Sequence, residues 1–315
     1  MIINPVLNKE LRDRVRTWRS PLLITIYILV LAGIGGFVFY TQTRYNYGGT
    51  QALRLGLTIF GFLSAAQLIL IAFLTPGMTA SIISGERERQ TWPLLLVTRL
   101  SPLSIATGKL LSAISYIVLL VLVSLPVYST VFLFGVVSMR DLLLVVLISL
   151  VTTVTIASIG LFCSALFKRT ITAIVISYLL TFFLLGGTLI LAVLIQNLNM
   201  EKQARLNQTF QPSTPFIVNF NPFVALGSAL PLGIDIVPFS RTLNVQVMSS
   251  SMTVSSQGVV RQGLVNQTVP VSPKPVVPRP VWQVNLMLDA IIVLVSLGLT
   301  VWLIRPLRAG NKKGG

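Results

Sequence analysis

Long runs of apolar residues, separated by short polar or charged stretches, make up most of this chain. A helix needs about 20 mostly apolar residues to cross ~30 Å of hydrocarbon. Five runs meet this requirement cleanly, and a sixth carries one acidic residue, Asp289, in its first third. The pattern therefore predicts an all-α polytopic membrane protein with six transmembrane helices, at residues 21–41, 55–83, 103–126, 142–167, 170–195 and 284–304.

The third apolar run is too long for one straight span. It continues beyond Pro126 to Val136, and a helix from Leu103 to Val136 would be ~50 Å long. Proline removes a backbone donor and disturbs the preceding helical turn. We therefore expect a kink at Pro126, with an outer piece turned along the membrane interface.

Basic residues indicate the orientation of the spans. Most Lys and Arg residues flank the helix ends that are inside if both termini are inside, whereas the short outer loops hold only Arg44, Arg54 and Arg140. Positive charge accumulates in cytoplasmic loops. Both termini are therefore expected in the cytoplasm, with 305–315 as a basic cytoplasmic tail.

The first 20 residues form an amphipathic segment and lack the pattern of a cleavable signal peptide. Leu7, Leu11, Val15 and Trp18 share one face of a helix, and oppositely charged pairs lie on the other side. We expect residues 1–20 to form a helix at the inner membrane interface. The helix is either a membrane anchor alone or an arm that also contacts a cytoplasmic partner.

Residues 196–283 differ from the rest of the chain and are expected to form a long extracytoplasmic segment. They contain ten of the seventeen prolines. Alternating polar and apolar positions at 242–248 and 258–269 are consistent with a small β-hairpin, and 270–280 is a proline-rich tether. The apolar stretch 216–237 is interpreted as a short helix on, or dipping into, the outer leaflet, with a full extra span as the alternative.

The composition supports a lipid environment and restricts the function. Charged residues make up 10% of the chain against 54% hydrophobic residues, and soluble domains carry roughly 25% charged residues. The net charge of +16 is explained by cytoplasmic loops and anionic lipid headgroups rather than by nucleic acid. With no histidine and a single cysteine, Cys163, in an apolar run, we find no nucleophile–base pair and no metal-binding cluster that would suggest an enzyme.

The stretch 84–102 is the most informative part of the chain. A glycine ends the second span, four alternating charges follow, and a short apolar helix that is too short to span precedes Ser101-Pro102. A short apolar helix beside four charges is typical of a docking element, and a solvated loop that forms ion pairs with itself is the alternative. The residues singled out are Gly85, Glu86, Arg87, Glu88, Arg89, Thr91, Trp92, Leu94, Leu95 and Leu96.

This stretch resembles the permease subunits of the ABC-2 type transporter family. There, an inner loop reads Gly-Glu-(Arg/Lys)-Glu-x-Gly-Thr, then an apolar helix, Leu-Ser-Pro and a Gly-Lys pair. This chain has Gly85 to Thr91, Leu94 to Leu96, Leu100 to Pro102 and Gly108-Lys109 at matching spacing. Gln90 replaces the usual glycine, and Pro93 stands where the family often has an acidic residue. The resemblance covers residues 1–195 well and the last span loosely.

The resemblance implies a permease subunit of an exporter in the bacterial inner (plasma) membrane, with no cofactor in this chain. A separate ABC ATP-binding subunit, which carries ATP and Mg²⁺, would dock on 84–102 and on the entry helix at 1–20. Two permease subunits, as a homodimer or heterodimer, would enclose the path. Gly108-Lys109 lacks the glycine and the Ser/Thr of a phosphate-binding loop, so ATP hydrolysis is expected elsewhere.

Two other observations qualify this hypothesis. Asp289 is the only carboxylate within a span, and it either reaches outer-leaflet water or a neighbouring helix, or forms part of the path. Glycines at Gly186-Gly187 and at 33–36 are expected to be packing points or bends. The alternative function is a non-transporting membrane scaffold or assembly factor that binds a partner through 196–283.

Overall fold

The described part of the computed structural model is a bundle of helices. It comprises residues 19–45, 51–91, 101–135, 137–205, 215–230 and 281–304. Six of its helices are long and apolar enough to cross a membrane, which confirms the six-helix prediction. The elements are α2 (Arg19–Tyr45), α3 (Gln51–Thr79), α4 (Ser84–Glu88), α6 (Pro102–Val123), α7 (Leu125–Phe132), α8 (Met139–Leu166), α9 (Thr170–Phe182), the π-helical turn η1 (Phe183–Gly187), α10 (Thr188–Arg205), the 3₁₀ turn η2 (Phe216–Phe220), α11 (Pro222–Ala229) and α13 (Val281–Ile304).

Several expectations fall outside these residues. They are the amphipathic helix with Leu7, Leu11, Val15 and Trp18, the apolar part of the loop with Trp92 and Leu94 to Leu96, the β-hairpin at 242–269, the tether and the basic tail.

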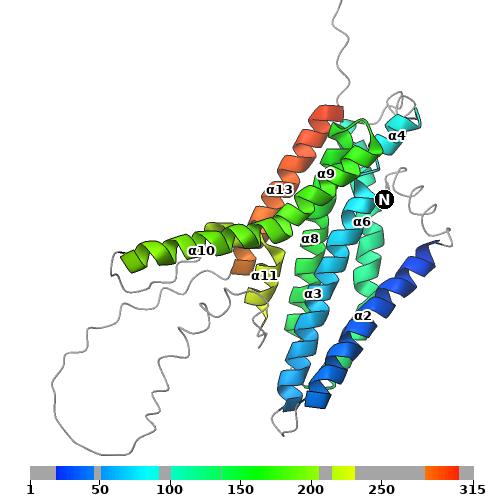
Figure 1. Cartoon of the computed structure of the whole chain (residues 1–315). Coiled ribbons are helices and arrows are strands. Elements are labelled where there is room, and N and C mark those ends of the chain that lie inside the picture. Colours follow the sequence, from blue (N-terminus) through cyan, green and yellow to red (C-terminus); the bar gives the residue numbers. More distant parts are fainter. Residues whose placement is uncertain are drawn as a thin grey trace, which may run out of the picture.

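Helix α8 lies at the centre of the bundle, in contact with α3, α6, α9, α11 and α13. Figure 1 shows these helices side by side, with α2 at one edge and α4 at one end. In their most apolar windows, 56% of the residues of α3 and α8 are buried, against 17% for α2 and 22% for α9–α10 and for α13. The peripheral helices therefore turn most of their apolar surface outward, as lipid-exposed helices do.

The predicted kink lies at Ser124, two residues before Pro126. Helix α6 ends at Val123, and Pro126 occupies the first turn of the new helix α7. A proline is tolerated there because the amide groups of a first helical turn have no partner in the helix. The backbone amides of Val127 and Tyr128 both bond the carbonyl of Ser124, which joins the two helices.

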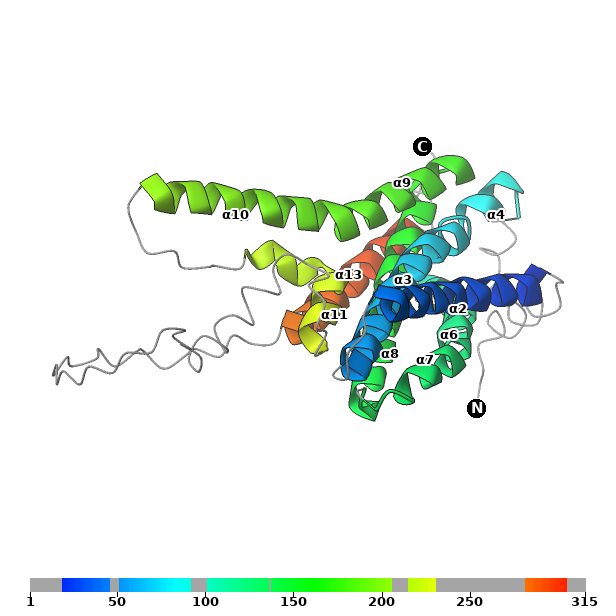
Figure 2. The ribbon, with the colours of Figure 1, turned by 60° about the horizontal axis from the view of Figure 1, so that its bottom comes forward.

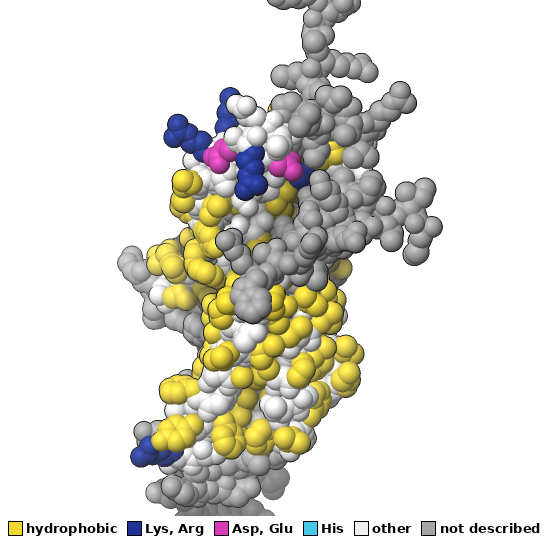
Figure 3. Space-filling model, turned by 90° about the vertical axis from the view of Figure 1, so that its right-hand side faces the viewer, with side chains coloured by type: hydrophobic (Ala, Val, Ile, Leu, Met, Phe, Trp, Pro, Cys, Tyr) yellow, Lys and Arg dark blue, Asp and Glu magenta, His cyan; other side chains and the backbone are white. Residues whose placement is uncertain are grey.

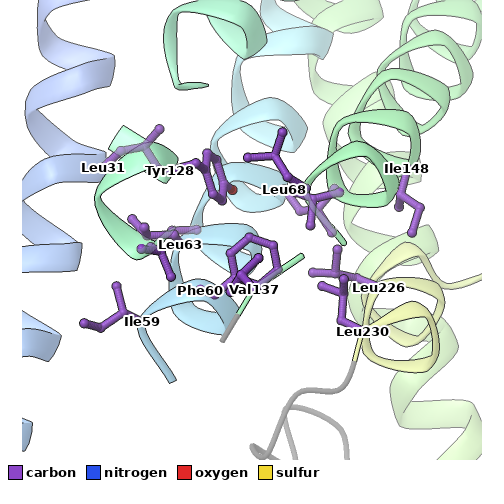
Figure 4. Close-up of a cluster of buried hydrophobic side chains, with 14 of the residues drawn as sticks. Leu31, Ile59, Phe60, Leu63, Leu68, Tyr128, Val137, Ile148, Leu226 and Leu230 are labelled. Carbon is purple, nitrogen blue, oxygen red and sulfur yellow. The ribbon is translucent and has the colours of Figure 1, made fainter. Parts of the chain in front are cut away.

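Helix α7, which follows α6, packs over a hydrophobic core. Tyr128 and Phe60 pack edge to face with their ring centroids 5.7 Å apart. Leu31, Leu63 and Leu226 belong to the same cluster, together with other buried residues of α2, α3, α6, α7, α8 and α11. Figure 4 shows these side chains pointing toward one another from elements that are distant in the sequence.

The fifth predicted span is part of a longer helix. Residues 170–195 were expected, whereas helix continues through η1 and α10 to Arg205, so that it is ~54 Å long. The additional residues are mostly good helix formers, such as Gln, Leu, Met, Glu and Lys, although they are too polar for a span. Figures 1 and 2 show α10 leaving the bundle sideways.

The apolar stretch after α10 forms two short helices, η2 and α11, rather than an extra span within 215–230. Asn221 separates them and is fully buried. Its side-chain amide donates to the carbonyl of Leu185 in η1 and to the hydroxyl of Thr188, and its oxygen accepts from the amide of Phe223. Asn221 therefore fixes the π-helical turn and starts α11, because both elements bond the same side chain.

The glycines differ in their contacts. A Cβ at Gly160 of α8 would clash with the hydroxyl of Thr79 in α3, and would lie 3.0 Å from the Cβ of Thr79 and 3.3 Å from the hydroxyl of Ser177 in α9. Gly33, Gly36 and Gly186 have no neighbour that a Cβ would meet. Of the glycines named, Gly160 is thus the one at which three helices approach closely.

We expect Gly160→Ala to destabilise the protein by about 1–3 kcal/mol, because Thr79 is β-branched and cannot turn away without losing its bond to Thr75. Gly298→Ala is the matched control, since its Cβ would meet nothing and alanine favours a helix. Thermal unfolding of the purified protein in detergent measures both. Equal effects of the two substitutions would contradict the close approach at Gly160.

Candidate functional site

The described charged side chains concentrate at the end of the bundle that carries α4, here called the α4 end. Figure 3 shows basic and acidic side chains there, above a broad hydrophobic surface. The α4 end comprises α4, the start of α6, the end of α8 and the start of α9. Its charged residues are Glu86, Arg87, Glu88, Arg89, Lys109, Lys168 and Arg169.

Helix α4 is joined to α8 at Ile83 and Ser84, which precede the charged residues of α4. The hydroxyl of Ser164, in the last turn of α8, accepts hydrogen bonds from the backbone amides of Ile83 at 2.8 Å and Ser84 at 3.0 Å. Amides of a first helical turn lack partners within the helix. Ser164 is fully buried, so it satisfies two amides that would otherwise have neither water nor protein as a partner.

The end of α4 is a Schellman motif. The amide of Thr91 bonds the carbonyl of Glu86, and the amide of Gln90 bonds that of Arg87. Gln90 has φ +58°, in the left-handed region, where the motif usually has glycine. This geometry is a physical reason why glycine is usual at this position in the family that the loop resembles.

Glu86 pairs with Lys109 of α6 across 2.5 Å. The lysine side chain is 1% exposed and the glutamate side chain 27% exposed. A buried ammonium group is strongly unfavourable without a partner. The pair therefore holds α4 against α6, and it explains how a lysine can lie within an otherwise apolar helix.

Arg87 bonds α8. Its guanidinium donates to the carbonyl of Ala165 across 2.7 Å. Ala165 lies in the last turn of α8, where carbonyls lack helical partners and positive charge is favourable. Arg87 thus caps the C-terminus of α8.

Glu88 caps the N-terminus of α9. Its carboxylate accepts hydrogen bonds from the backbone amide and from the hydroxyl of Thr170, both at 2.7 Å. These two bonds lower the pKa of the Glu88 carboxyl, the backbone bond contributing most. The charged form is therefore favoured, and the contact is lost only as the pH falls through the lowered pKa.

The structure brings together part of the predicted site. Glu86, Arg87 and Glu88 lie on α4, but their side chains bond α6, α8 and α9 of the same chain. Gly85 lies beside Thr170, whose hydroxyl would be 3.9 Å from a Cβ at this glycine. Arg89 and Thr91 are exposed, as is Gln90. Trp92, Leu94, Leu95 and Leu96 lie outside the described residues.

Asp289 is not part of the α4 end. It lies in α13, 15 residues before Ile304 and hence ~22 Å from the α4 end of that helix. It is 2% exposed, and its carboxyl has Thr155 of α8 as a hydrogen-bond partner. Asp289 was expected from the sequence to reach either outer-leaflet water or a neighbouring helix, and the structure shows the contact with a neighbouring helix. A role for Asp289 in a transport path stays a prediction.

Sequence reasoning missed the partners Ser164, Ala165 and Thr170. A serine in an apolar helix suggests helix packing, and a backbone carbonyl leaves no trace in the sequence. Thr170 offered a weak signal, because it directly follows two basic residues at the start of a span. The pairing of Lys109 was detectable in principle, since a charge inside a span needs a counter-charge.

We expect Glu86→Ala to destabilise the protein by about 3–5 kcal/mol, because it removes the carboxylate that bonds the buried Lys109 ammonium. Lys109→Met should also destabilise the protein, because Glu86 Oε1 then loses this bond while Glu86 Oε2 is already buried without a hydrogen-bond partner among the described residues. The double variant should be more stable than either single variant. Thermal unfolding in detergent tests this order. A Glu86→Ala variant as stable as the native chain would contradict it.

We expect Gln90→Gly to stabilise the protein by about 0.5–1 kcal/mol, because relief of left-handed strain exceeds the entropic cost of glycine. Arg89→Gly is the control one residue earlier, where φ is −78°. There glycine relieves no strain and should destabilise by about 0.5–1 kcal/mol. Shifts of the unfolding midpoint in opposite directions for the two variants would support the Schellman motif. Shifts in the same direction would argue against it.

Comparison with known proteins agrees with the resemblance of the loop. No curated protein matches the chain. A family model described as "ABC-2 family transporter protein" matches residues 4–258, which is well over half of the 315 residues and includes α2 to α11 as well as the α4 end. On this match, the chain belongs to the ABC-2 transporter family.

Proposed function

We propose that this chain is the membrane-spanning permease of an ABC exporter and that it docks a separate ATP-binding subunit at the α4 end. Family membership makes it a membrane permease component of an ABC transporter. The proposal adds the direction of transport, the docking surface and a cytoplasmic location of the α4 end. ATP and Mg²⁺ are bound and hydrolysed on the partner.

One observation carries this proposal: α4 is short, charged and fixed to three helices at once. Glu86 bonds α6, Arg87 bonds α8 and Glu88 bonds α9. A docking element must be rigid, because a partner's movement is transmitted only through contacts that do not yield. The side chains of Arg89, Gln90 and Thr91 remain exposed and available to a partner.

The remainder of the bundle is suited to this role. The described acidic residues, except Asp289, lie at helix ends, whereas ion-driven carriers place ionisable groups near the middle of the membrane. An energy source outside the spans is therefore favoured. Helices α2, α9–α10 and α13 are lightly buried, which leaves apolar surface for lipid and for a second permease subunit, identical or different, that together with this one encloses the path.

The proposal predicts that Arg89→Glu combined with Thr91→Glu weakens binding of the ATP-binding subunit roughly tenfold, equivalent to ~1.4 kcal/mol, because both side chains are exposed beside the docking element. Co-purification from the native membrane, measured as ATPase activity per permease, checks this. Arg140→Glu is the control, since Arg140 is also exposed but lies at the opposite end of α8.

Loss of the ATP-binding subunit in the Arg140 variant alone would place docking at the opposite end of the bundle. Transport by the purified chain without ATP would overturn the proposed function altogether.

A further inference from the structure

The attachments of α4 are of two kinds. Those to α6 and α8 are buried or partly buried, because Lys109 and Ser164 are almost inaccessible. The attachment to α9 is exposed, because Glu88 lies on the surface beside Thr170. Helices α4, α6 and α8 are therefore joined by buried or partly buried bonds, whereas Glu88 joins α4 to the start of α9 at the surface; α9 itself packs against α3 and α8.

Helix α9 depends on that carboxylate. Its own N-cap residue, Arg169, makes no side-chain cap hydrogen bond, although the first amides of a helix need acceptors. Glu88 supplies the acceptor from 82 residues away. It also places a negative charge at the positive end of the helix. The first amide of α9 is therefore capped by a side chain of α4 and not by its own N-cap residue.

Displacement of this first turn would affect a large element. Helix α9 continues through η1 into α10 without a break, and only 22% of its apolar window is buried. It is held to α3 by the Tyr178 hydroxyl, which donates to the carbonyl of Phe73 across 2.8 Å. It passes Gly160 of α8 closely at Ser177. Both contacts lie about two turns from Thr170. In the first turn itself, Ala173 is fully buried, and Glu88 holds the amide and the hydroxyl of Thr170.

We propose that Glu88 is the positioning residue that links a partner docked on α4 to α9, so that movement of α4 displaces α9 and α10 through the bonds to Thr170. This inference rests on the proposed function. Arg87 and Glu86 then have a different role, which is to keep α4 in register with α6 and α8.

The test uses the permease co-purified with its ATP-binding subunit, with and without ATP and Mg²⁺. Hydrogen exchange is measured at the amides of Thr170, which bonds Glu88, and Ala173, which bonds the carbonyl of Arg169. The variants are Glu88→Ala, which removes both bonds, Thr170→Val, which removes only the hydroxyl, and Thr170→Ser, which keeps it.

In the native complex we expect ATP to change exchange at these two amides. Glu88→Ala should co-purify like the native chain, exchange there roughly 2- to 30-fold faster, as for loss of an N-cap, and lose the response to ATP. Thr170→Val should weaken the response and Thr170→Ser should restore it. A cap that is only structural would speed exchange without abolishing the response.

Three outcomes would overturn the inference. The response to ATP could persist in Glu88→Ala, which would leave the proposed function intact. Glu88→Ala could lose the ATP-binding subunit while Thr170→Val retains it, which would make Glu88 a docking residue instead. Finally, no ATP-binding subunit could co-purify with the native chain, in which case the proposed function fails as well.

Discussion

The buried ammonium group of Lys109 imposes the strongest constraint on this structure. A positive charge that is 1% exposed needs a counter-charge close by, and Glu86 on α4 meets that need. The position of Glu86 fixes α4 over the start of α6, and the next two residues then reach α8 and α9. The arrangement of the α4 end thus follows from one charge that cannot be left alone in a low-dielectric interior.

Within the membrane-spanning part, the constraint is different. Apolar burial does little to distinguish one helix contact from another when lipid is equally apolar, so close approach and hydrogen bonds select the contacts. Gly160 lets α3 and α9 approach α8, and Asn221 joins α11 to the π-helical turn. The two kinds of constraint meet in α9, whose start is set by charge and whose middle is set by close packing.

The sequence predicted the number and the approximate positions of the spans, because a span has to be apolar along its whole length. It did not show how far α10 extends, since polar helix formers are compatible with helix and with loop. It also identified Glu86, Arg87 and Glu88 as important residues, but as docking groups. Glu86 pairs with a lysine 23 residues away, whereas the partners of Arg87 and Glu88 are a backbone carbonyl and a helix N-terminus about 80 residues away. A carbonyl and a helix N-terminus carry no pattern that can be recognised before the helices are placed.

The sequence distances between these partners also bear on how the protein is made. Glu86 and Lys109 are only 23 residues apart, so the lysine has its counter-charge as soon as the hairpin of α3 and α6 has been synthesised. Ala165 and Thr170 follow Arg87 and Glu88 by 78 and 82 residues. During synthesis, the Lys109 ammonium therefore gains its partner first, and Arg87 and Glu88 gain theirs only when the end of α8 and the start of α9 have been made.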